Sequence, residues 1–192
     1  RSDNPNISSV VHDEDEGIKR ALTHLASLGH RRIANIAGPQ RFSTGADRYA
    51  AFERHRAALR LAADENLVTF ARGYTESEGE RCVEELLARR QDFTAIVCAN
   101  DRLAIGAIES LARRGIRCPQ DVSITGYNDM PMVDRLKPPL TTVRIEQYKI
   151  GCDAGDLLAR MIEGGISQAS HVVLPVDLII RESTMALAKA ET

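Results

Sequence analysis

The sequence predicts an α/β fold in which a mostly parallel sheet carries helices on both of its faces. Short β-branched, apolar runs alternate with longer stretches of helical periodicity, at a spacing of roughly 25–30 residues. The short runs show little polar alternation, which is typical of strands buried on both faces. Repetition of strand, helix and strand favours right-handed crossovers and therefore a three-layer αβα, Rossmann-like arrangement.

The predicted strands are short and mainly apolar. They span residues 7–11, 33–37, 67–71, 95–99, 122–126 and 172–176. The stretches between them repeat apolar residues at helical spacing, as Ile18, Leu22 and Leu25 do. The predicted helices span residues 16–28, 44–63, 76–89, 101–114 and 148–163.

Local signals mark where several of these helices begin and end. The pattern Thr75-x-x-Glu78 is a capping box at the start of the helix predicted over 76–89. Gly29 and Gly115 follow the last apolar positions of two other helices, where glycine adopts a positive φ without steric cost. These boundaries divide the chain into compact strand–helix units.

Composition and charge exclude several classes of protein. With 43% hydrophobic and 27% charged residues the chain is globular rather than disordered. No apolar run approaches the ~18–20 residues that span a bilayer. Surfaces that bind DNA usually carry a basic excess, whereas this chain has a net charge of −2, so its residues are not expected to bind DNA. The four cysteines form no C-x-x-C pair and suit a reducing cytoplasm.

Polar or aromatic side chains follow successive strands, each near the carboxyl end. They are Thr44 and Arg48, then Tyr74, Asn100 and Asn128, after the strands at 33–37, 67–71, 95–99 and 122–126 in turn. Open parallel sheets bind ligands beyond the carboxyl ends of their strands. The set therefore predicts a cleft for a small polar molecule.

Each of these residues also has a plainer interpretation, which the sequence leaves open. Thr44 and Asn100 are suited to cap the helices that follow them. Arg48 would then be a solvated surface side chain, Tyr74 would serve only packing, and Asn128 would form a turn.

No motif for catalysis is present in the sequence. It holds no phosphate-binding loop, no G-x-G-x-x-G, no nucleophile elbow and no H-E-x-x-H. The acidic run at 13–16 and the basic run from His30 to Arg32 flank the first helix, where each favours the helix dipole, and the basic run is interpreted as solvated. We therefore predict no catalytic residues, no metal site, no cofactor and no enzymatic activity.

Several longer sequence motifs occur in a fixed order along nearly the whole chain. They are ALTHLASLGHRRIA at 21–34, AGP at 37–39, ANDRLAIGA at 99–107, PQDVSITGYND at 119–129, PPLTTVR at 138–144, LP at 174–175 and REST at 181–184. In content and order they resemble the LacI/GalR family of transcriptional regulators.

The resemblance implies a periplasmic-binding-protein-like, type I architecture, in which two Rossmann-like subdomains enclose an effector. Residues 1–12 and 145–171 would be pieces of the N-terminal effector subdomain. Residues 13–144 and 172–192 would form the C-terminal effector subdomain. The helix-turn-helix of the family and most of the first subdomain are expected to lie outside this chain.

By the same resemblance the family's effector contacts fall on the strand-end residues named above. Phe42 and Asp129 are additional candidate contacts. Asn128 stands where many members carry aspartate, and its amide is uncharged and adds a donor. A sugar, a sugar acid and a polyol all remain open as the effector.

The implied function is that of a cytoplasmic, ligand-responsive DNA-binding regulator of the repressor type. It would act as a homodimer that binds operator DNA through an N-terminal domain absent from this chain, without a membrane partner. The alternative is a periplasmic sugar-binding protein of a transporter, which shares the two-lobed fold. An α/β enzyme is a third and weaker possibility, because no catalytic set is visible.

Overall fold

A six-stranded sheet dominates the computed structural model, which describes residues 4, 6–90, 92–164 and 168–187. The strand order is β3-β2-β4-β5-β6-β8, and only the last pair, β6 and β8, is antiparallel. The elements in chain order are β1 (Ser9–His12), α1 (Glu14–Ser27), β2 (Ile33–Ala37), α2 (Ser43–Ala58), β3 (Val68–Phe70), α3 (Glu76–Arg89), β4 (Ala95–Cys98), α4 (Asp101–Arg113), β5 (Ser123–Asn128), β6 (Thr141–Arg144), α5 (Gln147–Ile162), β7 (His171–Leu174) and β8 (Asp177–Ile179), with 3₁₀ turns at Glu65–Leu67 and Val133–Arg135. The predicted mostly parallel α/β fold is confirmed.

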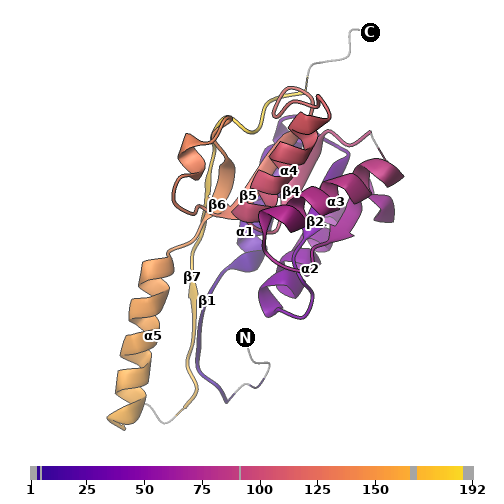
Figure 1. The fold of residues 1–192 in the computed structure, drawn as a ribbon. Coiled ribbons are helices and arrows are strands. Elements are labelled where there is room, and N and C mark those ends of the chain that lie inside the picture. The colour runs from indigo at the N-terminus through magenta and orange to yellow at the C-terminus, as the bar shows by residue number, and fades with distance from the viewer. Residues whose placement is uncertain (1–3, 5, 91, 165–167, 188–192) are drawn as a thin grey trace.

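Two apolar clusters fill the spaces on the two faces of this sheet. On one face α1 and α2 bury Leu22, Leu25 and Phe52 against it. On the other face α3 and α4 bury Leu86 and Leu103. Figure 1 shows the helices in these two layers, with the sheet between them. The three-layer arrangement follows from the single apolar stripe that each helix carries.

The helix predicted over 44–63 ends early, at Ala58. Arg60 adopts a φ of 53°, and its backbone N–H donates to the carbonyl of Ala57 at 3.0 Å. The N–H of Leu61 then donates to the carbonyl of Arg56, also at 3.0 Å, and the Leu61 side chain is buried. A left-handed residue that closes a helix in this way reverses the chain without glycine, so the sequence carried no usual stop signal.

The structure has two strands, β6 and β8, that the sequence pattern does not predict. Pro138 and Pro139 stand just before β6, and a pair of prolines indicates an extended link rather than a strand. β6 in fact pairs with β5 through Thr125↔Thr141, and β8 pairs with β6 through Val143↔Leu178. Strands of three or four residues carry too little periodicity to be recognised alone.

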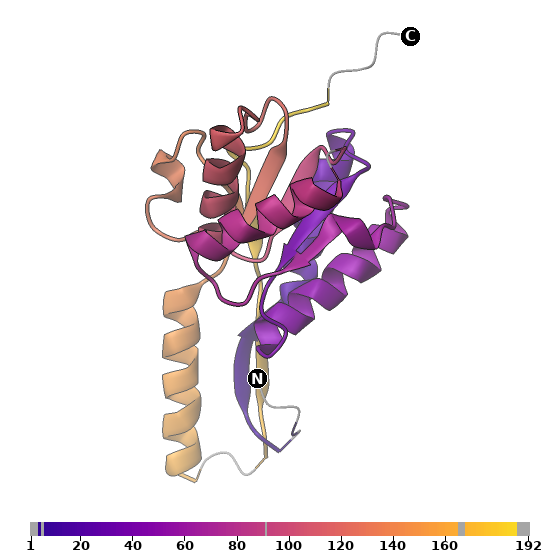
Figure 2. The same cartoon turned by 45° about the vertical axis from the view of Figure 1, so that its right-hand side comes forward.

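A smaller unit extends below the main sheet and contains β1, β7 and α5 (Figures 1 and 2). The strand predicted over 172–176 is β7, and it pairs in parallel with β1 from Ser9↔His171 to His12↔Leu174. β7 therefore does not belong to the six-stranded sheet. The chain returns to that sheet only at β8, which begins later than residue 172, where the sequence analysis starts the last piece of the C-terminal subdomain. None of the residues of α5 is buried. Within the described part of the chain, no helix combines the length and the apolarity needed to cross a bilayer.

The segment 181–185 returns across the ends of β5 and β6 and is fastened there by Ser183. The Ser183 hydroxyl donates to the carbonyl of Ile124 at 2.6 Å and accepts from the N–H of Thr141 at 2.8 Å. The backbone N–H of Ile124 donates to the carbonyl of Ser183 at 2.8 Å. The string REST thus has a structural role in closing the end of the sheet.

We expect Ser183→Ala to lower the free energy of unfolding by about 1–3 kcal/mol, because the buried Thr141 N–H loses its acceptor. Chemical denaturation measures the effect. Ser77→Ala, at an exposed serine in the first turn of α3, is the matched control and should change stability by no more than about 0.5 kcal/mol. Equal effects of the two substitutions would contradict the role given to Ser183.

Candidate functional site

A cleft of about 420 Å³ opens at the carboxyl ends of β2, β4 and β5. Its lining brings together all of the strand-end residues that the sequence predicts. The lining residues are His12, Glu14, Thr44, Arg48, Tyr74, Asn100, Arg102, Asn128 and Ile145. A larger hollow, of about 670 Å³, lies along β3 and shares no lining residue with this cleft.

Arg48 lies in the floor of the cleft and is only 6% exposed, so the solvated interpretation is wrong. Its Nε and Nη2 donate to the carboxylate of Glu14 at 2.6 and 3.1 Å, and its Nη1 donates to the carbonyl of Ala99 at 2.5 Å. The guanidinium also stacks 3.7 Å from the ring centroid of Tyr127. Most of its donors are therefore used within the protein.

Thr44 and Tyr74 both line the cleft and contact each other. The Thr44 and Tyr74 hydroxyls are 3.1 Å apart and share a hydrogen bond. The prediction that Thr44 caps α2 is wrong, because that helix begins at Ser43 and its N-cap is Phe42, which makes no side-chain cap bond. Gly38 makes room for Tyr74, since a Cβ there would lie 2.5 Å from the Tyr74 hydroxyl.

Asn100 follows β4 as the N-cap of α4, Asn128 ends β5, and both carry uncharged amides. Asn100 caps α4 by accepting from the N–H of Leu103 at 2.9 Å, as predicted. That bond uses its oxygen, so the amide NH₂ remains a donor. Asn128 has a φ of 115°, a conformation that asparagine tolerates better than most residues. Asn128 is the last residue of β5 and pairs with Arg144 of β6, so its interpretation as a turn residue is wrong.

Phe42 and Asp129 do not line the cleft. The Asp129 carboxylate accepts from Nε of Arg144 at 2.6 Å and from Nη2 of Arg181 at 2.7 Å. It therefore links β6 to the segment that follows β8. Phe42 is 45% exposed, and its ring is stacked at 6.3 Å from that of Tyr74, which does line the cleft.

His12, Glu14, Arg102 and Ile145 line the cleft but were not predicted as site residues. His12 ends β1, so the strand-end rule would have found it and Glu14 if it had been applied to the first strand as well. Burial lowers the pKa of His12. Nε and Nη2 of Arg102 donate to the carboxylate of Glu76 at 2.9 and 2.8 Å.

His30 is 2% exposed, which corrects its interpretation as part of a solvated helix end. Its ring lies between the Thr94 hydroxyl at 2.9 Å and the carbonyl of Met185 at 3.0 Å. Burial lowers the pKa of His30, and it also lowers the pKa of His24. Asp101, buried beside the cleft, shifts in the opposite sense, because burial raises its pKa to about 6.

These shifts predict that acidification below pH 6.5 destabilises the fold. Histidines with a lowered pKa stay neutral when folded, whereas the unfolded chain binds protons near pH 6.5, so stability falls as the pH falls. Asp101 opposes this, because its raised pKa adds stability that is lost as the pH rises from 3.8 to about 6. Above pH 6 the Asp101 carboxyl is mostly ionised in both states, so the histidines set the sign there. Thermal melts from pH 7.5 to about 6 test the sign. His30→Gln should flatten the slope, and a flat profile of the parent protein would contradict the prediction.

Comparison with family models gives a match of residues 22–184 to the periplasmic binding protein-like domain. Among curated proteins, the HTH-type transcriptional regulator CelR of Thermobifida fusca is 33% identical over 92% of this chain and 52% of its own length. The HTH-type transcriptional repressor PurR of Haemophilus influenzae (strain 86-028NP) is 32% identical over 95% of this chain and 56% of its own length. The chain thus spans about half the length of the curated relatives it matches.

Solved structures show the same similarity. A transcriptional regulator CelR–cellobiose complex superimposes with a TM-score of 0.90 at 33% identity, over 93% of this chain and 54% of that one. A lac repressor dimer bound to operator and the anti-inducer ONPF superimposes with a TM-score of 0.89 at 27% identity, over 96% of this chain and 63% of that one.

Proposed function

The chain belongs to the periplasmic binding protein-like domain family, in the form found in LacI/GalR-type transcriptional regulators, and from this we propose that it is the effector-binding part of a ligand-responsive regulator. The observation that carries the proposal is one cleft that gathers Thr44, Arg48, Tyr74, Asn100 and Asn128. The strand-end rule and the family resemblance select these residues together. Hydroxyl, amide and aromatic groups at one rim suit a small hydroxylated ligand.

The smaller unit supports the proposed division of the chain into pieces of two subdomains. A two-stranded sheet with one helix cannot bury a core of its own. The side chains of Tyr148 and Ile162 on α5 are 87% and 77% exposed, and Val173 on β7 is 57% exposed. We propose that residues 1–12 and 145–171, together with β7, belong to the N-terminal effector subdomain, which would cover these apolar surfaces and complete the cleft.

The charges around the cleft favour a neutral effector. Glu14 neutralises Arg48, and Glu76 neutralises Arg102. His12 is uncharged at neutral pH because burial lowers its pKa. The other lining residues carry no charge, so an anionic ligand would find no uncompensated cation among the described residues. We therefore favour a neutral sugar or polyol over the sugar acid that the sequence also allowed, and the relative bound to cellobiose supports this choice.

A thermal-shift screen on the protein that carries this chain tests the proposal. A ligand that binds only the folded state raises the apparent melting temperature. The screen would compare neutral mono- and disaccharides, beginning with cellobiose, with polyols and with sugar acids. Stabilisation by sugar acids alone would contradict the neutral class, and stabilisation by none of these ligands would contradict effector binding in this cleft.

We expect Tyr74→Ala to weaken binding of the effector by about tenfold or more, through loss of the aromatic platform and its hydroxyl. Isothermal titration calorimetry measures the affinity. Phe70→Ala, which removes an exposed aromatic outside the cleft, is the control and should bind as the parent does. If both variants retain the parent's affinity, Tyr74 is not in the binding site.

The regulator would act as a cytoplasmic homodimer on operator DNA through a separate DNA-binding domain and would not transform its ligand. The alternative of a transporter's periplasmic sugar-binding protein is not favoured, because CelR and PurR, the relatives named above, are transcription regulators. A gel-shift assay with DNA from the neighbouring promoter, with and without effector, tests the coupling between the two sites. DNA binding that ignores the effector would contradict the proposal, as would chemical turnover of the ligand.

A further inference from the structure

The six-stranded sheet ends at β3, and among the described residues this strand pairs only with β2. Beside it lies the hollow of about 670 Å³, whose lining includes Tyr49 and Arg56 of α2, Arg81 and Arg89 of α3, and Phe70 of β3. The outward N–H and C=O groups of an edge strand form a template for another strand. An edge that faces a hollow of this size therefore needs some device that keeps it from pairing.

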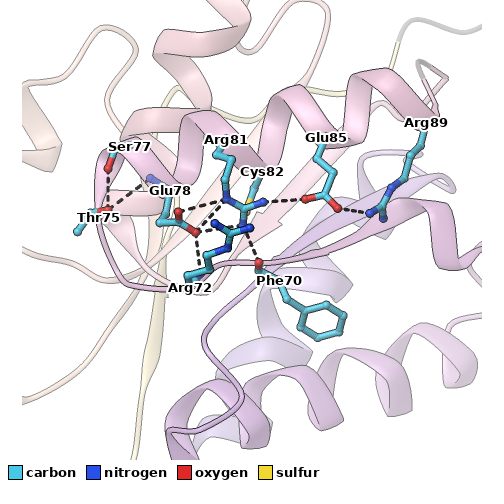
Figure 3. A network of polar contacts seen from close by, with 9 residues as sticks. All are labelled: Phe70, Arg72, Thr75, Ser77, Glu78, Arg81, Cys82, Glu85 and Arg89. Atoms are coloured by element: carbon cyan, nitrogen blue, oxygen red, sulfur yellow. Dashed lines mark hydrogen bonds and ion pairs between the residues drawn. The ribbon is translucent and has the colours of Figure 1, made fainter.

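The outward carbonyls of β3 are already occupied by arginines. Nη2 of Arg81 donates to the carbonyl of Phe70 at 2.8 Å, and Nη1 of Arg89 donates to the carbonyl of Val68 at 3.2 Å. In a parallel ladder alternate residues turn their backbone groups away from the partner strand, and Val68 and Phe70 are such an alternate pair. Figure 3 shows Arg81 reaching from α3 to the Phe70 carbonyl.

Two glutamates on the same helix hold these arginines in place. Glu78 accepts from Nε of Arg81 at 3.2 and 3.1 Å, and Glu85 accepts from Nη1 of Arg81 at 2.8 Å. The other oxygen of Glu85 accepts from Nη2 of Arg89 (Figure 3). The hydrogen bond from Arg81 lowers the pKa of Glu78, so its carboxylate stays charged at neutral pH. Glu78, Arg81, Glu85 and Arg89 are called the α3 guard below.

We propose that the α3 guard closes the β3 edge against strand addition by a second copy of this chain. The edge strand of one copy is complementary to the same strand of another in antiparallel orientation, because each offers alternating donors and acceptors. Phe70 is 43% exposed and would add apolar contact to such a pair. The guard removes the acceptors at Val68 and Phe70 and places two guanidinium groups where the incoming backbone would lie.

The test is the double substitution Arg81→Ala and Arg89→Ala in the protein that carries this chain. Light scattering after size exclusion would measure molar mass over a dilution series. Species larger than the parent's own assembly should appear at a concentration lower by about tenfold or more, since two backbone acceptors per copy become free to pair. Adding Phe70→Pro removes an outward N–H at the edge and should reverse the association.

The matched control is Arg113→Ala with Arg114→Ala, two arginines at the end of α4 that pair with Glu80 and Glu84 of α3 and lie outside the cleft. It should leave the assembly as in the parent. Circular dichroism reports folding, and if the guard variant does not fold, Arg89→Ala alone should show a smaller shift in the same direction. An unchanged assembly in the folded guard variant would overturn the proposal, and so would association that Phe70→Pro does not reverse.

Discussion

Replacing Arg48 by alanine should lower the free energy of unfolding by about 3–5 kcal/mol, because it leaves the Glu14 carboxylate without its partner in a largely buried site. The side chains of Arg48 and Glu14 are only 7% and 12% exposed, and their atoms approach to 2.6 Å. The substitution also removes the stack of the guanidinium on Tyr127. Chemical denaturation of variant and parent measures the difference.

A matched control lies on the same helix. Arg54 forms an ion pair with Asp15 in which the two side chains are 61% and 45% exposed, so Arg54→Ala should cost less than about 1 kcal/mol. The double substitution Arg48→Met with Glu14→Leu should be less destabilised than Arg48→Ala, because neither buried charge is then left unpaired. An effect of Arg48→Ala no larger than that of Arg54→Ala would contradict the ion pair as a main support of the cleft.

Gly106→Ala should lower the free energy of unfolding by about 3 kcal/mol, at the upper end of the usual cost of overpacking. A Cβ at Gly106 would lie 1.9 Å from the carbonyl oxygen of Glu76, and one at Gly79 would lie 2.2 Å from that of Leu103. Both obstacles are backbone atoms, so α3 and α4 would have to separate. Because Asn100 and Arg102 stand at the start of α4, effector binding should weaken as well.

Gly155→Ala is the control for this substitution. Gly155 lies in α5, where an added Cβ meets nothing within 4 Å. Alanine should therefore raise stability there by about 0.5–1 kcal/mol through its higher helix propensity. If Gly106→Ala changes stability by less than about 0.5 kcal/mol, the close packing of α3 on α4 does not constrain this position.

Local sequence signals predicted many of the helices and strands of this fold correctly. The strand predicted over 33–37 coincides with β2, and the helix predicted over 76–89 coincides with α3. Thr75 and Asn100 cap their helices as predicted, because a cap joins a side chain to a backbone N–H three residues later. The strand-end rule also grouped the cleft residues, since parallel strands bring their carboxyl ends to one rim.

What the sequence by itself determined was most of the strands and helices, the caps at Thr75 and Asn100 and the residues at one rim, because these depend on neighbours within a few positions. Only the tertiary structure decided which residues and strands distant in the sequence pair with one another. Arg48 pairs with Glu14, 34 residues earlier; β1 pairs with β7; and the arginines of α3 reach the edge of β3. Such contacts depend on how elements pack after the chain has folded, and no local pattern records which distant group a buried charge or a free carbonyl will meet.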